Sequence, residues 1–273
     1  MDGSDNISGP EPRSKRLRGG WLLEAAGFAA LYFLYDRARD AVAGSGRVAL
    51  DNAKDLVTVE RWLWLYHERT MQRWVLPHHW FVSFWNIYYG TIHFVMPVVA
   101  LVWLYRRFPK RYVVWRNTLL WMLGIGLVCF WLYPLMPPRL MPHQYGFVDT
   151  PSKFFNFGPQ VPVHFRPDHT PDARSIKEFG NLFAAMPSLH VGWSTFCAVS
   201  LFPIIRRRWI RVLLVAYPCT VIFGIIVTGN HWILDAAGGW VVLAAGWFIA
   251  TRLGAWHQRR TRAPDQPARA PAA

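Results

Sequence analysis

Two short polar segments interrupt an otherwise apolar sequence and hold the residue types best suited to chemistry. The first, MPSLHVGW at 186–193, contains Ser188 and His190, and the second, TGNHWILD at 228–235, contains His231 and Asp235. A histidine in a hydrocarbon environment is costly to keep and is usually retained for function. Asp235 follows His231 by four residues, so the two side chains share one helix face. This spacing indicates a carboxylate that orients a histidine acting as nucleophile or acid.

The elements that position these residues are predicted to be transmembrane helices. The chain has 273 residues, of which 53% are hydrophobic and 17% charged, and the apolar residues form long clusters. A helix needs about 20 apolar residues to cross the hydrocarbon core. Six stretches approach that length: 80–105, 112–135, 188–205, 209–229, 232–252 and a shorter one with Glu24, 21–35. We therefore expect an all-α, polytopic membrane protein with a six-transmembrane-helix bundle.

The net charge of +14 would suggest a nucleic-acid partner in a soluble protein, but here its distribution has another explanation. Basic residues fill two short connections and flank both ends: Arg106, Arg107, Lys110, Arg111; Arg206, Arg207, Arg208, Arg211; the segment 13–20; and Arg259, Arg260, Arg262. Short loops rich in Lys and Arg mark the cytoplasmic side of a membrane, and they also attract anionic lipids. The pattern predicts a multi-pass protein of the plasma membrane with both termini cytoplasmic, membrane lipids as partners and no nucleic acid.

Four further segments lie outside the spans. Residues 1–19 and 257–273 are rich in Pro, Gly, Arg and Ala, and we expect disordered tails there, on either side of one membrane catalytic domain over 20–256. Residues 47–76 mix apolar and charged residues at helical spacing, which predicts an interfacial amphipathic helix with Trp62, Trp64 and Trp74 at headgroup depth. The long loop 137–185 is expected to form an extracytoplasmic lid or substrate platform.

With six spans, three polar elements reach the same depth on one side of the membrane. They are the segment 137–139 with Arg139, the segment 187–190, and His231 with Asp235. The chemistry that fits is phosphoryl transfer through a covalent phosphohistidine: an arginine and a serine bind phosphate oxygens, and two histidines act as nucleophile and general acid. No metal or other cofactor is expected, because cationic side chains can neutralise the phosphate charge.

The segments PSLH and GNHWILD resemble the second and third signature motifs of the type-2 phosphatidic acid phosphatase superfamily. They are more closely similar to its branch that includes inositol phosphorylceramide synthase and related lipid phosphotransferases, and the resemblance covers about residues 80–252. It implies a metal-independent membrane enzyme acting on a lipid phosphate or phosphodiester, with water or an inositol-type or lipid alcohol as acceptor. By position, His231 matches the nucleophile, Asp235 its partner, His190 the acid and Ser188 a phosphate ligand.

Two departures from the family pattern concern the phosphate-binding residues. The first motif, a lysine followed by Arg-Pro, is absent, and MPPRLMP at 136–142 resembles the Pro-Pro-Arg replacement of the branch, which makes Arg139 the candidate phosphate ligand. The Ser-Arg pair upstream of the third-motif histidine is replaced by apolar Ile225 and Ile226. We expect a basic loop residue to substitute; the candidates are Lys153, Arg166 and Arg174.

Other interpretations of these residues stay open at the level of sequence. Six further histidines are expected to be ordinary interfacial residues: His78, His79, His93, His143, His164 and His169. A metal site built from His190, His231, Asp235 and a loop histidine is chemically possible, although Arg139 nearby would repel a cation. A transporter or flippase that binds an anionic lipid without chemistry would use helices broken by proline, and the apolar stretches contain Pro97, Pro203 and Pro218.

Overall fold

The computed structural model describes residues 20–42, 44–151 and 181–262, and within them every regular element is a helix. The expected N-terminal tail 1–19, residues 263–273 of the expected C-terminal tail 257–273, and most of the long loop lie outside the described residues. Residues 257–262, which were expected in that tail, instead continue the last helix. In chain order the helices are α1 (Gly20–Ala41), α2 (Gly46–Trp62), α3 (Glu68–Val75), α4 (His79–Arg107), α5 (Pro109–Leu132), the 3-10 turns η1 (Pro138–Leu140) and η2 (His143–Tyr145), α8 (Leu189–Leu201), α9 (Arg208–Val227) and α10 (Ile233–Arg262).

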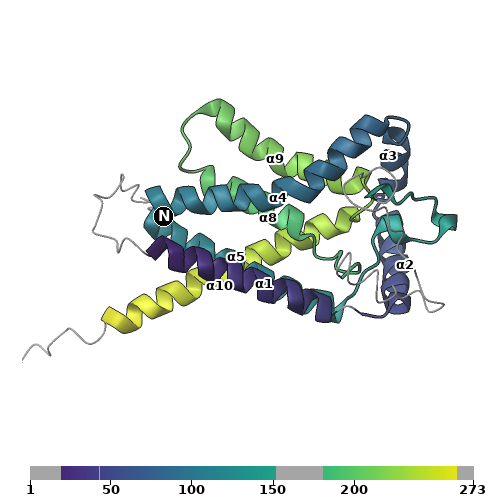
Figure 1. Cartoon of the computed structure of the whole chain (residues 1–273). Coiled ribbons are helices and arrows are strands. Elements are labelled where there is room, and N and C mark those ends of the chain that lie inside the picture. Colours follow the sequence, from purple (N-terminus) through teal and green to yellow (C-terminus); the bar gives the residue numbers. More distant parts are fainter. Residues whose placement is uncertain (1–19, 43, 152–180, 263–273) are drawn as a thin grey trace, which may run out of the picture.

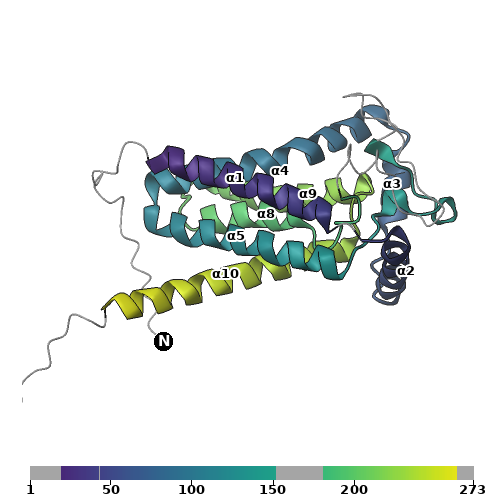
Figure 2. The same cartoon turned by 60° about the horizontal axis from the view of Figure 1, so that its bottom comes forward.

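The long helices form a bundle around a central short one. Helices α1, α4, α5, α9 and α10 run lengthwise, and α8 lies among them in contact with α4, α5, α9 and α10 (Figures 1 and 2). Within the described residues, four helices are long and apolar enough to cross a membrane: His79–Arg107, Pro109–Leu132, Arg208–Val227 and Ile233–Trp256. The protein is thus an all-helical integral membrane protein, and the count of six spans stays a prediction.

Helix α8 is shorter than the apolar stretch 188–205 predicted. Its 13 residues rise about 20 Å, against the ~30 Å hydrocarbon core. Ser188 begins the helix as its N-cap, with its hydroxyl oxygen 3.5 Å from the Val191 N–H. Pro203, which has no N–H to donate, lies two residues after its end. Both ends of α8 are therefore defined locally, and the helix holds His190 inside the bundle.

Helices α2 and α3 lie across one end of the bundle (Figures 1 and 2). The sequence predicted a single amphipathic helix over 47–76, but the structure breaks it at Leu63–His67, where Trp64 adopts a left-handed φ of 59°. Trp62, Trp64 and Trp74 are exposed. The opposite face of α2 packs with Leu135, Phe183 and Trp232 in a second apolar core, so α2 supports the same end of the bundle as the polar segments.

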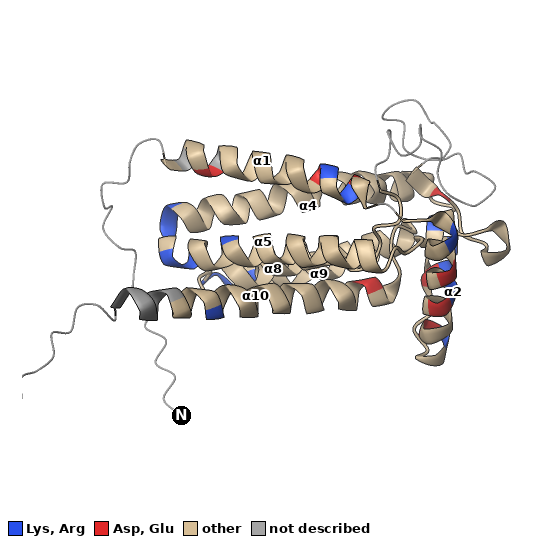
Figure 3. Cartoon of the chain, turned by 90° about the horizontal axis from the view of Figure 1, so that it is seen from below, with Lys and Arg blue, Asp and Glu red and all other residues tan. Residues whose placement is uncertain are grey.

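The sign of the charged residues differs between the two ends of the bundle. Lys and Arg gather at the turn between α4 and α5, while α2 at the other end carries charges of both signs (Figure 3). This is the distribution that a cytoplasmic α4–α5 turn requires. The orientation itself stays a prediction.

Close packing of α10 depends on glycines. A Cβ placed on Gly239 would overlap the Ser188 carbonyl oxygen, and one on Gly246 would lie 2.8 Å from the Thr118 carbonyl oxygen. A Cβ on Gly254, further along the same helix, meets nothing within 4 Å. The backbones of α10, α8 and α5 therefore approach one another as only glycine allows, and the approach at Gly239 positions the start of α8.

We predict that Gly239→Ala lowers the free energy of unfolding by about 1–3 kcal/mol, because the added methyl group must push α10 away from Ser188. Thermal unfolding of the purified protein in detergent measures the effect. Gly254→Ala is the matched control, and its melting temperature should stay unchanged or rise slightly because alanine is the better helix former. Equal melting temperatures for both variants would show that the helix approach is not tight.

Candidate active site

His231 is buried at the turn between α9 and α10, and both of its ring nitrogens have partners. Its Nδ1 lies 2.8 Å from the Ala185 carbonyl oxygen and 3.2 Å from Asp235 Oδ2, and its Nε2 lies 3.2 Å from His190 Nδ1. The predicted pair His231 and Asp235 is therefore in contact, one helical turn apart. The predicted third member, His190, reaches the same point from α8.

These partners assign the position of the His231 proton. A carbonyl and a carboxylate oxygen can only accept, so Nδ1 must carry the hydrogen. Nε2 is then left with an unprotonated lone pair, and His190 Nδ1–H donates to it. The ring thus presents a nucleophilic nitrogen toward His190 while Asp235 and Ala185 hold the other edge.

The segment that presents the Ala185 carbonyl is itself fixed by long-range hydrogen bonds. Leu135 N–H donates to the Phe183 carbonyl at 2.8 Å, and the two segments form a short parallel β-bridge. Trp232, fully buried beside His231, donates its indole N–H to the Met136 carbonyl at 2.9 Å. Both ends of the long loop therefore contribute to holding His231 in place.

His190 lies in a stack of aromatic rings. Its ring centroid is 4.4 Å from Tyr89, nearly parallel to it, and 4.3 Å from the ring of His93. His93 in turn stacks on Trp193 at 5.4 Å. These contacts, from α4 and α8, exclude water from one side of His190 and limit the rotation of its ring.

The start of α10 is capped by three carboxyl groups. Asp235 Oδ2 accepts from the Trp232 N–H, Glu68 Oε1 accepts from the Ile233 N–H, and Glu60 Oε1 accepts from the Leu234 N–H, each at 2.9 Å. Free N–H groups at a helix start need acceptors when buried, and negative charge there is favoured by the helix dipole. Glu60 and Glu68 are completely buried. Two glutamates from the α2–α3 region thus fix the turn that carries His231.

Arg139 lies beside this turn. Its backbone N–H donates to the Gly229 carbonyl at 2.9 Å, and a Cβ on Gly229, whose φ is 71°, would lie 3.3 Å from the Arg139 Cβ. The guanidinium donates from Nε to Asn230 Oδ1 and from Nη1 to Asp149 Oδ1, both at 2.9 Å. An anion arriving at Arg139 must therefore compete with the carboxylate of Asp149.

The other predicted phosphate ligands differ in how the structure places them. Ser188 is buried, its backbone N–H donates to the Asp235 carbonyl at 2.9 Å, and its hydroxyl caps α8. Lys153, Arg166 and Arg174 lie outside the described residues. A cation that the sequence did not single out is Arg39 on α1: its charge acts on both His190 and Tyr89, and it pairs with Asp36 and Asp40.

Comparison with known proteins identifies the family. The sequence model of the PAP2 superfamily matches residues 54–249, which is more than two thirds of the chain. The chain belongs to the PAP2 superfamily. Membership supports a lipid phosphatase or phosphotransferase type of function, with lipid phosphates as substrates. The predicted resemblance to this superfamily is confirmed, and its inositol phosphorylceramide synthase-like branch stays a prediction. Searches of the curated proteins and of the solved structures found no match.

Besides Arg39, three residues around this candidate site were not predicted from the sequence. His93 was expected at an interface, but it is buried against His190. The argument that singled out His190, a histidine inside an apolar stretch, applies equally to His93 at the middle of 80–105. Glu60 and Glu68 carried no such signal, because acidic residues on an amphipathic helix are usually exposed.

The alternative metal site finds no support in the side chains that the structure describes. Among them, no group of three or more His, Cys, Asp or Glu residues is arranged to hold a metal ion. In particular, His231 uses Nδ1 for Asp235 and Nε2 for His190, so both ring nitrogens are engaged. The loop histidines His164 and His169 lie outside the described residues.

The carboxyl pair predicts a pH dependence of stability. Burial, and then the negative charge of Glu68, raise the pKa of Glu60 well above its ordinary value. The folded protein therefore keeps a proton that the unfolded chain loses above pH ~4.3, so the free energy of unfolding falls as pH rises from there toward the raised pKa. Glu60→Gln keeps an oxygen acceptor for Leu234 and removes the titration. We predict a flatter pH dependence for this variant, measured by thermal unfolding at a series of pH values.

Asp51→Asn provides the control for this series, because Asp51 lies on the same helix and is exposed. Its pH dependence should match that of the unaltered protein. If Glu60→Gln and the unaltered protein lose stability in parallel as pH rises, Glu60 is not the protonated group.

Proposed function

We propose that this PAP2 protein is an integral membrane lipid phosphotransferase or phosphatase that works through a phosphohistidine on His231, at the extracytoplasmic face. The observation that carries the proposal is the pairing of His231 Nδ1 with Asp235 and Ala185, which leaves the Nε2 lone pair for attack. Family membership supports lipid phosphate as the substrate class. The polar site at one end of an apolar bundle suits a substrate whose phosphate lies at the membrane surface.

In the proposed first half-reaction, His231 Nε2 attacks phosphorus and the bond to the leaving oxygen breaks. His190, which enters this step as the imidazolium, gives one proton to that oxygen, so the lipid alcohol leaves neutral and His190 becomes neutral. Attack places a positive charge on the His231 ring, which the Asp235 carboxylate stabilises through Nδ1–H. Arg139 and Ser188 would bind the phosphoryl oxygens as their charge develops.

The distance between the two histidines sets a condition on substrate binding. A nucleophile approaches phosphorus at about 3–3.5 Å and an acid reaches the leaving oxygen at about 2.6–3.2 Å, so nitrogens on opposite sides of a phosphoryl group lie roughly 6 Å or more apart. In the structure they lie 3.2 Å apart. Substrate must therefore break the His190–His231 hydrogen bond and separate the rings, which the proposal treats as part of binding.

In the second half-reaction an acceptor hydroxyl attacks the phosphohistidine, and His190, now neutral, takes the acceptor's proton. Water gives a phosphatase, and an inositol-type or lipid alcohol gives a phosphotransferase. We favour transfer, on the resemblance of PSLH and Pro-Pro-Arg to the synthase branch. Incubation of purified protein with radiolabelled lipid phosphate, with and without candidate alcohols, separates the two: transfer yields a new phosphate monoester of the acceptor alcohol, and hydrolysis alone yields inorganic phosphate.

We predict that His231→Asn lowers kcat for lipid phosphate turnover by at least about 10⁴-fold, because no other group replaces the nucleophile. Release of product from purified protein measures it. His143→Ala is the control, since His143 is exposed in η2, and its activity should be unchanged. Full activity of His231→Asn would remove His231 as the nucleophile, whereas no turnover by the unaltered protein would favour a protein that binds or flips anionic lipids without chemistry.

We also predict that Arg139→Gln reduces kcat/KM by roughly 10- to 100-fold, the cost of losing a hydrogen bond from a charged donor to phosphate. Arg139→Lys should recover part of the loss because it restores the charge without the planar fork. Arg39→Gln tests in the same assay whether α1 supplies the second cation. An Arg139→Gln enzyme with unchanged kcat/KM would place phosphate elsewhere.

A further inference from the structure

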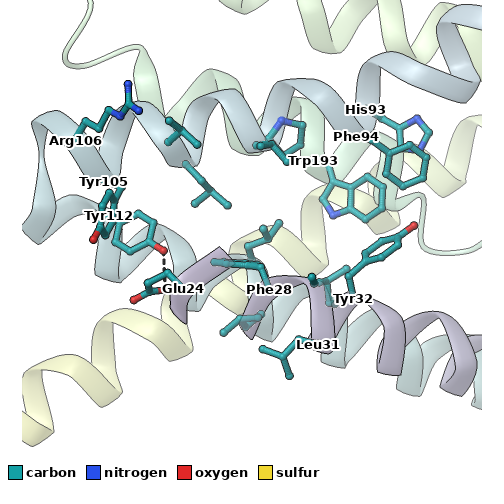
Figure 4. A pocket seen from close by; sticks show the side chains of 18 residues that line it. Glu24, Phe28, Leu31, Tyr32, His93, Phe94, Tyr105, Arg106, Tyr112 and Trp193 are labelled. Atoms are coloured by element: carbon teal, nitrogen blue, oxygen red, sulfur yellow. Dashed lines mark hydrogen bonds between the residues drawn. The ribbon is translucent and has the colours of Figure 1, made fainter. Parts of the chain in front are cut away.

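A large apolar cavity lies beside the candidate active site. Its volume is about 750 Å³, within the range of small-molecule sites. Figure 4 shows it bounded by side chains of α1, α4, α5 and α8, with His93, Phe94 and Trp193 at one end and Tyr105, Arg106 and Tyr112 at the other. Between these ends its walls are aliphatic and aromatic, from residues such as Phe28, Val98 and Leu101.

The cavity borders the ring stack around His190. His93 lines it and lies 4.3 Å from the His190 ring, and Trp193, which also lines it, stacks on His93. On α4 the lining runs from His93 to Arg106, thirteen residues or about 20 Å. One leaflet of a bilayer has about 15 Å of hydrocarbon. The cavity therefore extends from the depth of the histidines through at least the length of one lipid chain.

Helix α1 forms one wall of this cavity and is held by polar contacts at both ends. Near its start, Glu24 accepts from Arg116 Nη1 at 2.7 Å and from the Tyr112 hydroxyl at 2.8 Å. Near its end, Asp40 accepts from the Asn181 N–H at 3.0 Å, and Asn181 Nδ2 donates to the Arg39 carbonyl at 2.9 Å. Between these tethers α1 packs on α5. The two tethers thus keep α1 in place across a cavity that its own apolar face does not fill.

We propose that this cavity binds one hydrocarbon chain of the lipid whose phosphate reaches His231, with the α1 tethers fixing the width and length of the chain site. This proposal rests on the proposed function. It adds that the enzyme selects its substrate by the hydrocarbon chain. The chain lies along α4 with its phosphate end at His93 and its methyl end toward Glu24. A lining without unpaired charge along most of its length suits an aliphatic chain.

The first experiment maps the chain directly. Full-length His231→Asn protein in nanodiscs is irradiated with phosphatidic acid that carries a photoreactive diazirine near the methyl end of one chain, and labelled peptides are identified by mass spectrometry. The expected labels lie on the cavity side of α4, α1 and α5, at residues such as Val102, Phe28 and Leu119. Labels confined to residues outside the cavity would overturn the proposal. Because this protein need not turn over substrate, the result is independent of whether the proposed chemistry is right.

A matched set of valines on α4 tests chain selectivity. Val98 and Val102 line the cavity, about 7.5 Å and 13.5 Å beyond His93 along the helix. Val99 is exposed to a similar extent, 47% against 59% for Val98 and 46% for Val102, but it is not part of the lining. Val98→Trp should reduce kcat/KM for long-chain phosphatidic acid by roughly 10-fold or more and leave short-chain, dihexanoyl substrate unaffected. Val102→Trp should move the preferred chain to a shorter length. Val99→Trp should behave as the unaltered protein.

Each outcome of this series decides the proposal. Equal dependence of kcat/KM on chain length in Val98→Trp and Val99→Trp would overturn the proposal. A Val98→Trp variant that changes its oligomeric state but not its chain selectivity would also overturn it, because a second copy of the protein would then fill the cavity. If Val98→Trp fails to fold by gel filtration, Val102→Trp and the labelling pattern still decide. If the unaltered protein turns over no lipid phosphate, the proposed function is contradicted. The labelling experiment would still show whether the cavity binds a lipid chain.

Discussion

The structure depends on how the buried start of α10 satisfies its backbone N–H groups. Asp235, Glu68 and Glu60 accept from three consecutive residues, 232–234, directly after the histidine that we propose as nucleophile. A buried donor without an acceptor costs about 1–3 kcal/mol, so this turn has one well-satisfied conformation. Asp235 Oδ2 takes part twice, because it also faces His231 Nδ1. One carboxylate oxygen therefore fixes both the helix start and the orientation of the imidazole.

The need to satisfy the N–H groups at the start of α10 also connects helices α2 and α3 to His231. Helices α2 and α3 cross the end of the bundle, and each contributes one of the two buried glutamates that cap α10. Each glutamate has an Oε2 atom that finds no hydrogen-bond partner among the described residues, and burial together with the charge of Glu68 raises the pKa of Glu60. A proton held by this pair keeps two negative charges from meeting in a buried site. Helices α2 and α3 thus support the turn that carries His231 rather than only covering it.

Local patterns in the sequence were enough to find the centre of the site but not its support. His190, His231 and Asp235 were predicted from polar residues in apolar sequence and from a four-residue spacing, and the structure brings them together. Glu60 and Glu68 bind α10 across 174 and 165 residues of chain, and no local pattern encodes such a contact. The predicted all-helical bundle is confirmed, whereas the single interfacial helix was wrong because Trp64 adopts a left-handed φ between two helices. Boundaries like this one depend on tertiary packing that hydropathy does not report.

The most direct test of the account is the identity of the phosphorylated nitrogen. Protein mixed with radiolabelled lipid phosphate, quenched in alkali within milliseconds and digested, should yield one labelled peptide that contains His231, with phosphate on Nε2, because Nδ1 carries the proton shared with Asp235 and Ala185. The His190→Asn variant in parallel should leave the site of labelling unchanged. Phosphate on His190, phosphate on Nδ1 of His231, or turnover with no labelled histidine would contradict the account.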